Sequence, residues 1–375
     1  MQKIKVAHIL HSVGGVDVSL RQILQNLDTK DFECFVIHGE NDIKENFRDK
    51  DSKVILDYKL PIYRSISPKN DFMAFVKTFQ ILRKERPDII HSHSTKGGIF
   101  ARAAGFLTGV KVLHTPQAFS YLSTNKKMKR AFFLRLEKIF SKGNSILLAS
   151  SESELNRAIN EVGYPKSKTL LFKNAIEPIK NISELSITKT WPDEYLCTVG
   201  RPCYQKNLQE LIYILYEINK IRKMHLVVLG VGHHADQLEE VKELISKLGL
   251  NKNVTMLNWT SREDVLNIIN DSQLYLSTAR YEGLPYAVIE SLALSKPCVV
   301  SNCDGNRDLI ENGFNGYVID NNDSAAFCEK IIELSNDKDT YNEFSIKARK
   351  TFEKNYNILE RINNLEVIYK EQIKK

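Results

Sequence analysis

The chain has 375 residues, which is more than one ordinary hydrophobic core contains. Its residues are 42% hydrophobic and 26% charged, a composition that excludes a largely disordered protein. Its longest apolar run, residues 211–216, excludes a membrane-spanning helix, which needs about 20 apolar residues. The formal net charge of +7 suits a phosphate-rich ligand, an anionic membrane or nucleic acid, without choosing among them.

Strand-length apolar runs alternate with stretches of helical period, which is typical of parallel sheets covered by helices on both faces. In the first half the predicted strands are residues 6–10, 34–38, 54–56, 89–91, 110–114, 145–149 and 169–172. Residues 177–191 lack periodicity and predict a linker. The second half has predicted strands at residues 195–199, 225–229, 254–257, 274–276, 297–300 and 316–319, and a terminal helix at 357–373.

The loop after the first strand of each half carries groups suited to an anionic ligand. Gly14 and Gly15 precede a helical stretch, so their backbone can approach a ligand. In the second half Gly200 and Arg201 follow the strand, with Lys206 in the same loop. Arginine offers a planar fork to phosphate oxygens and lysine a point charge, which suits a diphosphate. Two solvated surface cations would fit the same positions.

Two glutamates separated by seven residues form the most informative motif. Glu282 precedes a helix predicted to begin near Pro285, and Glu290 lies more than a turn inside that helix. A carboxylate just before or inside this helix can accept hydrogen bonds from paired sugar hydroxyls. Residues 287–289 are apolar, so burying Glu290 beside them is costly unless a partner binds it. A helix-capping glutamate and a surface glutamate would give the same spacing.

These residues resemble the E-x7-E motif of retaining glycosyltransferases with the GT-B fold, and most closely glycosyltransferase family 4. The similarity includes, in order, Gly14–Gly15, residues 91–94 with 96–98, Lys173–Asn174, Gly200–Arg201 with Lys206–Asn207, and residues 312–313 with 315–316. It implies an α/β protein of two Rossmann-like domains that face each other across a cleft. The expected ranges are 1–176 for an acceptor-binding domain, 192–355 for a nucleotide-sugar-binding domain, and 356–375 for a terminal helix packing back toward the first domain.

The resemblance also implies roles for individual residues. Arg201 and Lys206 would hold the donor diphosphate and Glu282 would lie beside the transferred sugar, which makes these three the expected catalytic residues. Glu290 would bind the nucleotide ribose, and the loop of Gly14 and Gly15 would close over the reaction centre. The complete expected donor-binding set is Gly15, Gln117, Asn174, Gly200, Arg201, Lys206, Gly283, Leu284, Pro285 and Glu290. The expected acceptor-binding residues are Gly14, His93 and Lys96.

One position departs from the family pattern. Many relatives have a histidine that touches the donor sugar where this chain has Gln117, and an amide cannot carry a proton as imidazolium does. His114 could substitute, although strand alternation points the two positions to opposite faces. In the mechanism usually proposed for retaining relatives, the departing phosphate helps to deprotonate the acceptor, so no strong protein base is required.

We expect a cytoplasmic protein without a catalytic metal or other cofactor. The N-terminus shows no signal-sequence pattern, and the six cysteines show neither a CxxC pair nor metal-ligand spacing with histidine. The two D-x-D sequences, at residues 49–51 and 337–339, lie in charged stretches that predict exposed loops.

A basic amphipathic stretch, Lys126 to Phe140, places Met128, Phe132, Leu136 and Ile139 on one helical stripe. Such a helix could rest on the anionic inner face of a membrane, or its stripe could pack into the core with a solvated basic face. Elsewhere the positive charge is dispersed, so we do not expect nucleic-acid binding.

The expected function is transfer of a sugar, such as an N-acetylhexosamine, from a UDP-linked donor to a polysaccharide or lipid-linked intermediate. Two alternatives remain at this stage. One is a sugar-nucleotide 2-epimerase of the same fold, which needs no separate acceptor. The other is a catalytically silent protein that binds sugar nucleotides, which the replacement at Gln117 leaves open.

Overall fold

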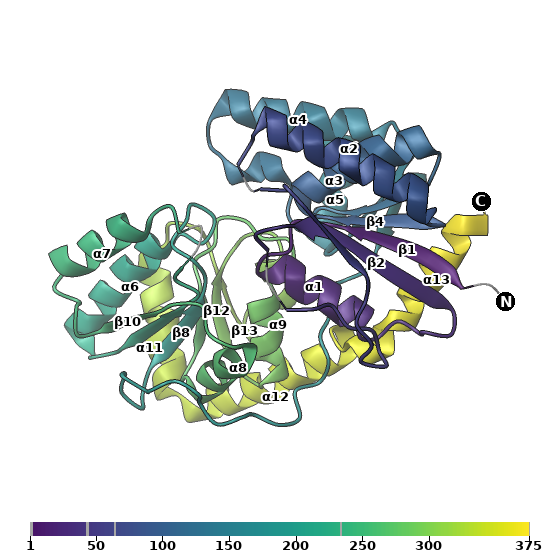
Figure 1. The fold of residues 1–375 in the computed structure, drawn as a ribbon. Helices are drawn as coiled ribbons and strands as arrows, with labels where there is room; N and C mark the ends of the chain where they lie inside the picture. Colours follow the sequence, from purple (N-terminus) through teal and green to yellow (C-terminus); the bar gives the residue numbers. More distant parts are fainter. Residues whose placement is uncertain (1–2, 43–44, 64, 233–234, 375) are drawn as a thin grey trace. The chain divides into compact units, whose positions relative to one another are not determined.

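The computed structural model describes residues 3–42, 45–63, 65–232 and 235–374, and the chain divides into two compact units (Figure 1). Unit 1 comprises Met1–Glu177 together with Ile358–Lys375, and unit 2 comprises Pro178–Asn357. Met1, Gln2 and Lys375, which the expected domain ranges include, lie outside the described residues.

Unit 1 is built around one parallel sheet with the strand order β3-β2-β1-β4-β5-β6-β7. Its strands are β1 (Ile4–Ile9), β2 (Phe32–Gly39), β3 (Asp57–Leu60), β4 (Ile89–His93), β5 (Val112–Thr115), β6 (Ser145–Ala149) and β7 (Thr169–Leu171). Its helices are α1 (Gly15–Leu24), α2 (Pro68–Glu85), α3 (Ser94–Thr108), α4 (Lys127–Ser141), α5 (Glu152–Arg157), which a π-helical turn at Ala158–Val162 extends, and α13 (Ile358–Lys374). Short 3₁₀ turns lie at Ser120–Ser123 and Lys166–Lys168.

Unit 2 has a second parallel sheet with the order β10-β9-β8-β11-β12-β13. Its strands are β8 (Leu196–Val199), β9 (Leu226–Leu229), β10 (Val254–Leu257), β11 (Tyr275–Ser277), β12 (Cys298–Ser301) and β13 (Gly316–Ile319). Its helices are α6 (Leu208–Ile221), α7 (Leu238–Lys247), α8 (Arg262–Asp271), α9 (Tyr286–Ala293), α10 (Asn306–Leu309), α11 (Ser324–Asn336) and α12 (Lys338–Asn355). Residues 177–191 have no regular helix or strand, as the sequence predicts.

Every predicted strand except the third has a counterpart within two residues of its predicted ends. The strand predicted at residues 54–56 is wrong, because Val54 and Leu56 are about half exposed and the third strand is β3. β3 lies at the edge of the sheet and only its Leu60 is buried. An edge strand tolerates polar side chains, so its apolar content does not mark it in the sequence.

Helices cover both faces of the unit 1 sheet. Ile9 and Ile90 pack with Ala101 on the face of α2 and α3, whereas Val6 packs with Leu365 on the face of α1 and α13 (Figure 1). One strand contributes side chains to both faces of the sheet, because its successive side chains point in opposite directions. The last helix of the chain is therefore part of the core of unit 1.

Each sheet contains one point where the direction of chain progression reverses. In unit 1 the chain moves outward through β2 and β3 and returns to β4, which pairs with β1. In unit 2 it moves outward through β9 and β10 and returns to β11, which pairs with β8. Open α/β sheets bind ligands beyond the carboxyl ends of the strands at such points. The loops after β1, β4, β8 and β11 are therefore the first places to look for a site.

Candidate active site

In unit 2 the loops after β8 and β11 meet through a buried carboxylate. Glu282 Oε1 lies 2.7 Å from Lys206 Nζ, and Glu282 Oε2 accepts a hydrogen bond from Gln205 Nε2 at 3.1 Å. Gln205 Nε2 also donates to the Tyr281 carbonyl at 3.2 Å. The structure therefore brings two of the three expected catalytic residues into one ion pair, because both follow neighbouring strands of the sheet.

The third expected catalytic residue, Arg201, starts the loop that carries Lys206. Its side chain is partly buried, and it has no ion-pair partner among the described residues. Gly200 is required for close packing, since a Cβ there would lie 2.9 Å from Lys206 Cγ. The lysine stem thus lies against the backbone that leaves β8. The loop therefore carries two cations, Arg201 and Lys206, and Lys206 forms an ion pair with Glu282.

The segment between the two glutamates leads directly into α9. Pro285, near which the helix was predicted to begin, directly precedes its first residue, Tyr286, and Gly283 and Leu284 are buried with it. A neighbouring glycine holds this segment: a Cβ at Gly305 would lie 2.8 Å from the Gly283 carbonyl oxygen and 3.0 Å from Glu282 Cβ. Gly305 has φ +79°, a conformation that favours glycine.

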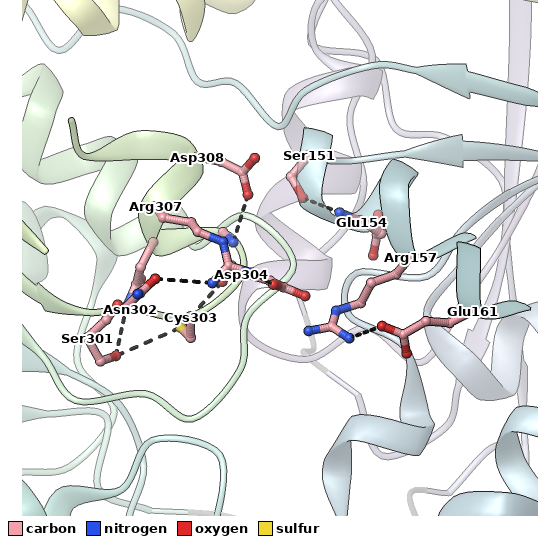
Figure 2. A network of polar contacts seen from close by, with 12 residues as sticks. Ser151, Glu154, Arg157, Glu161, Ser301, Asn302, Cys303, Asp304, Arg307 and Asp308 are labelled. Carbon is pink, nitrogen blue, oxygen red and sulfur yellow. Dashed lines mark hydrogen bonds and ion pairs between the residues drawn. The ribbon is translucent and has the colours of Figure 1, made fainter. Parts of the chain in front are cut away.

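The loop after β12, which carries Gly305, is cross-linked by its own polar groups. Figure 2 shows the labelled residues of this loop, Ser301 to Asp308, gathered around one turn. Ser301 Oγ donates to the Ala279 carbonyl at 2.6 Å, Arg307 donates to Asn302 at 3.2 Å, and the Gly305 amide donates to Asp308 at 2.9 Å. These bonds fix the surface against which the Glu282–Gly283 peptide rests.

Glu290 lies on a helix whose eight residues are all buried. Its Oε1 lies 3.0 Å from Arg262 Nη2 at the start of α8. Burial raises the pKa of Glu290, and the charge of Arg262 partly opposes this shift. The sequence analysis expects burial of Glu290 to be costly unless a partner binds it, and within the protein Arg262 is such a partner.

In unit 1 the expected donor residues Gln117 and Asn174 bind each other. Gln117 Nε2 donates to Asn174 Oδ1 at 3.2 Å, and Asn174 Nδ2 donates to Gln117 Oε1 at 3.1 Å. Gln117 Nε2 also contacts Ser19 Oγ of α1 at 3.0 Å. Both residues follow strand ends, and their amides form a paired hydrogen-bonding surface.

The backbone at Gln117 is unusual and is held by a buried glutamate. Gln117 and Ala118 have φ values of +56° and +82°. The Ala118 amide donates to Glu154 Oε1 at 2.8 Å, and the Glu154 amide donates to Ser151 Oγ at 3.0 Å (Figure 2). The position that carries histidine in many relatives is thus a turn fixed from α5.

The ring of His114, the other candidate for that role, is enclosed among buried groups of β4 and α3. It is fully buried, its Nδ1 lies 3.0 Å from Ser92 Oγ, and a Cβ at Gly98 would lie 2.2 Å from its Cε1. Burial lowers the pKa of His114 well below its usual range.

The expected acceptor residue His93 lies in a buried histidine cluster. Its Nε2 is 3.1 Å from His8 Nδ1, and burial lowers its pKa to about 3. His91 in the same cluster contacts Tyr369 of α13 at 2.7 Å and Thr115 at 3.0 Å. The nearest nitrogens of the three histidines lie within 4.8 Å of one another, a spacing that a metal could use. His91 already uses both of its nitrogens in hydrogen bonds, so it would have to give one up to hold a metal.

The other expected acceptor residues occupy the starts of α3 and α1. Lys96 Nζ lies 2.6 Å from Asp71 Oδ1 and donates to the Ser65 carbonyl, so it ties α3 to the beginning of α2. Gly14 has φ +61° and directly precedes Gly15, the first residue of α1. A Cβ at Gly14 would meet nothing within 4 Å, so the backbone here is open on the side where a side chain would be.

One hollow in unit 2 lies away from these groups. It has a volume of about 420 Å³ and is lined by linker residues together with Tyr195, Asn267 and Asp271. These residues lie before β8 and at the end of α8, not at the carboxyl ends of the strands. We do not assign it to the site, because the charged groups that suit a ligand are elsewhere.

The groups at the carboxyl ends of the unit 2 sheet suit one class of ligand. Arg201 and Lys206 can neutralise phosphates, Glu290 can accept hydrogen bonds from hydroxyls, and amides at the start of α9 can face an anion. Together with the Rossmann-like topology, their chemistry suits a nucleotide diphosphate that bears sugar hydroxyls.

Comparison with known proteins identifies the family. The model of Glycosyltransferase Family 4 matches residues 13–179, and the model of Glycosyl transferases group 1 matches residues 186–351. The chain belongs to these glycosyltransferases with the GT-B fold.

Individual relatives cover nearly the whole chain. A UDP-Gal:alpha-D-GlcNAc-diphosphoundecaprenol alpha-1,3-galactosyltransferase of Escherichia coli is 28% identical over 98% of this chain and 97% of its own. The capsular polysaccharide biosynthesis glycosyltransferase CapM of Staphylococcus aureus is 24% identical over 95% and 94%. The solved structure of Anabaena HepE with UDP and glucose matches with a TM-score of 0.78 at 15% identity, covering 98% of this chain and 100% of that one. The fold predicted from the sequence is confirmed.

Four site residues were not found from the sequence: Ser19, Gln205, Arg262 and Gly305. Gln205 lies inside a motif that was recognised, but an amide beside a lysine carries no signal of its own. Arg262 is 28 residues from Glu290 in sequence, and only the packing of α8 beside α9 brings them together. Gly305 is distinguished by its backbone conformation, which composition does not reveal.

The pair of Arg262 and Glu290 predicts a pH-dependent loss of stability in Arg262→Ala. Removing the arginine leaves a buried carboxylate uncompensated, so the free energy of unfolding of unit 2 should fall by about 1–3 kcal/mol at pH 8, allowing for the partly exposed arginine. Since a raised carboxyl pKa makes the folded state bind the proton more tightly than the unfolded state, the loss should shrink toward pH 5.

Urea unfolding followed by tryptophan fluorescence measures this directly, because both tryptophans, Trp191 and Trp259, lie in unit 2. The double variant Arg262→Ala, Glu290→Gln should recover most of the loss. An equal loss at pH 5 and pH 8 would contradict the assignment.

Proposed function

We propose that the chain is a retaining transferase that moves a hexose or N-acetylhexosamine from a UDP-linked donor to a lipid-linked saccharide. The E. coli relative is named for a UDP-galactose donor and a diphosphoundecaprenol acceptor, and the HepE structure contains UDP. Both names support a uridine nucleotide, and the first supports a polyprenyl diphosphate acceptor.

The observation that carries this proposal is the pairing of both motif glutamates with cations. Lys206 and Arg262 neutralise Glu282 and Glu290 before any ligand is bound. In the proposed complex Lys206 leaves Glu282, and Lys206 and Arg201 form ion pairs with the donor diphosphate. Glu290 then accepts the ribose hydroxyls, and Glu282 faces the transferred sugar.

The remaining expected residues complete the proposed complex. In unit 2, Gly200 lets the Lys206 stem lie flat, and the backbone of Gly283, Leu284 and Pro285 contacts the sugar or phosphate. In unit 1, Gly15, Gln117 and Asn174 contribute to the donor site. Gly14, His93 and Lys96 belong to the acceptor side, where Lys96 must exchange Asp71 for the acceptor and the buried His93 supports the strand end.

The proposed mechanism requires no protein base and no metal. Gln117 can hydrogen-bond the donor sugar but cannot accept its proton at neutral pH. The departing phosphate oxygen, neutralised by Arg201 and Lys206, is basic enough to take the acceptor proton as the glycosidic bond breaks. Attack and departure then occur on the same face of the sugar, which retains its anomeric configuration.

A donor screen followed by a transfer assay tests this function. We expect UDP to raise the melting temperature more than GDP, ADP or CDP, and UDP-galactose or UDP-N-acetylglucosamine to label a diphosphoundecaprenol-linked saccharide in the presence of EDTA. Conversion of UDP-N-acetylglucosamine without an acceptor would instead identify a 2-epimerase. Binding of the donor with no turnover on any lipid-linked acceptor would identify a silent binding protein.

Lys206→Ala should reduce turnover more than donor binding. The lysine faces a diphosphate that gains negative charge as the glycosidic bond breaks, so its interaction strengthens toward the transition state. Loss of one such preorganised donor reduces kcat by about 100-fold to 1000-fold. Steady-state kinetics should show this loss, with Lys220→Ala, an exposed lysine of the same unit, as the control. A normal kcat with only a raised KM would show that Lys206 binds both states equally.

We further propose that α4 rests on an anionic membrane surface that carries the acceptor. Met128 is 89% exposed, and Phe132 and Ile139 are each 61% exposed. This contradicts the alternative in which the stripe packs into the core; only Leu136 is partly covered. Among the described residues, no helix combines the length and apolar composition needed to cross a membrane.

The charge of α4 supports the same proposal. Its exposed charged residues are all basic: Lys127, Lys129, Arg130, Arg135 and Lys138, flanked by Lys126 and Lys142. None of them has an ion-pair partner in the described part of the chain. Glu137, the one acidic residue of the helix, is buried against Arg102 at 2.6 Å, which anchors the opposite side of the helix. Exposed apolar side chains among cations are the features of an interfacial helix.

The triple variant Met128→Ser, Phe132→Ser, Ile139→Ser should float poorly with vesicles that contain phosphatidylglycerol. We expect the wild-type protein to float with these vesicles and not with neutral phosphatidylcholine vesicles, since the contact needs both apolar burial and charge. The matched control replaces three exposed apolar residues of unit 2, Ile221, Phe314 and Ile346, with serine. Equal flotation of the two triple variants would contradict the proposal.

A further inference from the structure

The loop between β1 and α1 is held by side chains and not by regular structure. The sheet bonding of this segment ends where the Leu10 amide donates to the Ile37 carbonyl at 3.1 Å, and helix α1 begins at Gly15. Between them the chain turns through Ser12 and reaches Gly14 with φ +61°. A loop of this kind keeps one conformation only if other groups bind its backbone.

A buried carboxylate from the neighbouring loop supplies those bonds. Asp42, which follows β2, accepts a hydrogen bond from the Ser12 amide at 2.5 Å and from the Gly39 amide at 2.8 Å. Its other oxygen lies 2.5 Å from His11 Nδ1. A Cβ at Gly39 would lie 2.5 Å from this oxygen, so only glycine leaves room for the carboxylate. Asp42 thus binds both the backbone and a ring of the loop.

A row of alternating acidic and imidazole groups stabilises the charge on Asp42. His38 Nδ1 lies 3.7 Å from Asp42, and His38 Nε2 lies 2.9 Å from Asp57 Oδ2 of the edge strand. Burial alone would raise the pKa of Asp42, but hydrogen bonds from His11, His38 and the Ser12 amide lower it to about 2. Burial lowers the pKa of His38, but its two carboxylate partners outweigh burial and raise it. Asp42 is therefore ionised throughout the neutral range.

The other end of the loop is tied to α1 by a second carboxylate. Ser12 Oγ donates to Asp17 Oδ1 at 2.6 Å, and Arg21 Nε lies 2.8 Å from Asp17 Oδ2. Ser12 is therefore bound twice: its amide donates to Asp42, which follows β2, and its hydroxyl donates to Asp17 of α1. The two contacts leave Gly14, two residues further on, little freedom to move.

We propose that Asp42 is a positioning residue for sugar transfer: through Ser12 and His11 it holds the Gly14–Gly15 backbone in the conformation that contacts the donor and the acceptor. This inference rests on the proposed function, in which Gly15 contributes to the donor site and Gly14 belongs to the acceptor side. Asp42 itself touches neither donor nor acceptor. Its effect is on geometry, and a displacement of about 1 Å at a reaction centre can reduce the rate about 100-fold.

Two measurements on Asp42→Ala test the proposal. Hydrogen exchange of the segment from residue 10 to residue 17 should be faster in the variant, because the Ser12 amide loses its acceptor. The kcat for transfer should fall by about 10-fold to 100-fold, while UDP affinity stays near the wild-type value because the proposed nucleotide groups lie in unit 2. A role in stability alone would lower the melting temperature and leave kcat of the folded protein unchanged.

Two further variants sharpen the comparison. Asp42→Asn keeps an oxygen that can accept from the Ser12 and Gly39 amides, so it should retain more activity than Asp42→Ala and should fold where that variant does not. Asp57→Asn removes the outer carboxylate of the same row and should leave kcat unchanged. Wild-type kcat and exchange in both Asp42 variants, or an equal loss of kcat in Asp57→Asn, would overturn the proposal. Absence of UDP binding or transfer by the wild-type protein would overturn the proposed function instead.

Discussion

The site in unit 2 depends on the cost of burying two carboxylates. Glu282 and Glu290 are both buried, and a buried carboxylate without a partner costs several kcal/mol. Two ion pairs offset this cost: Lys206 from the loop after β8 pairs with Glu282, and Arg262 from the start of α8 pairs with Glu290. The same strand and helix packing that makes the sheet therefore also fixes where the charges lie. A site of this kind is assembled before the ligand arrives.

This arrangement pairs both buried carboxylates with cations in the ligand-free protein, and it leaves Arg201 without an ion-pair partner among the described residues. A donor diphosphate would compete with Glu282 for Lys206, and ribose hydroxyls would compete with Arg262 for Glu290. Either exchange would take a cation away from a buried carboxylate, so hydroxyls of the donor would have to supply the hydrogen bonds that Glu282 and Glu290 lose. In unit 1 the corresponding groups are uncharged: the paired amides of Gln117 and Asn174 and the open backbone at Gly14.

The sequence predicts the sheets well because buried parallel strands are nearly continuous apolar runs. It misplaces β3, whose polar side chains are tolerated at an edge, and it identifies the site loops through glycine, arginine and the glutamate pair. It cannot find Arg262 or Gly305, whose importance comes from contacts across the fold. For α4 the helical period was correct but ambiguous, since an apolar stripe has the same spacing whether it packs inward or lies exposed. Only the structure shows that Met128 and Phe132 face solvent.

Titration calorimetry of UDP with Glu290→Ala tests the central claim that the buried glutamate is the ribose contact. Hydrogen bonds to a charged group contribute roughly 1.5–3 kcal/mol, so the Kd for UDP should rise about 10-fold to 100-fold. Inorganic pyrophosphate should bind the variant as it binds the wild type, because the phosphate cations are untouched. Glu217→Ala, an exposed glutamate of the same unit, serves as the control. An unchanged Kd for UDP in the folded Glu290 variant would contradict the account.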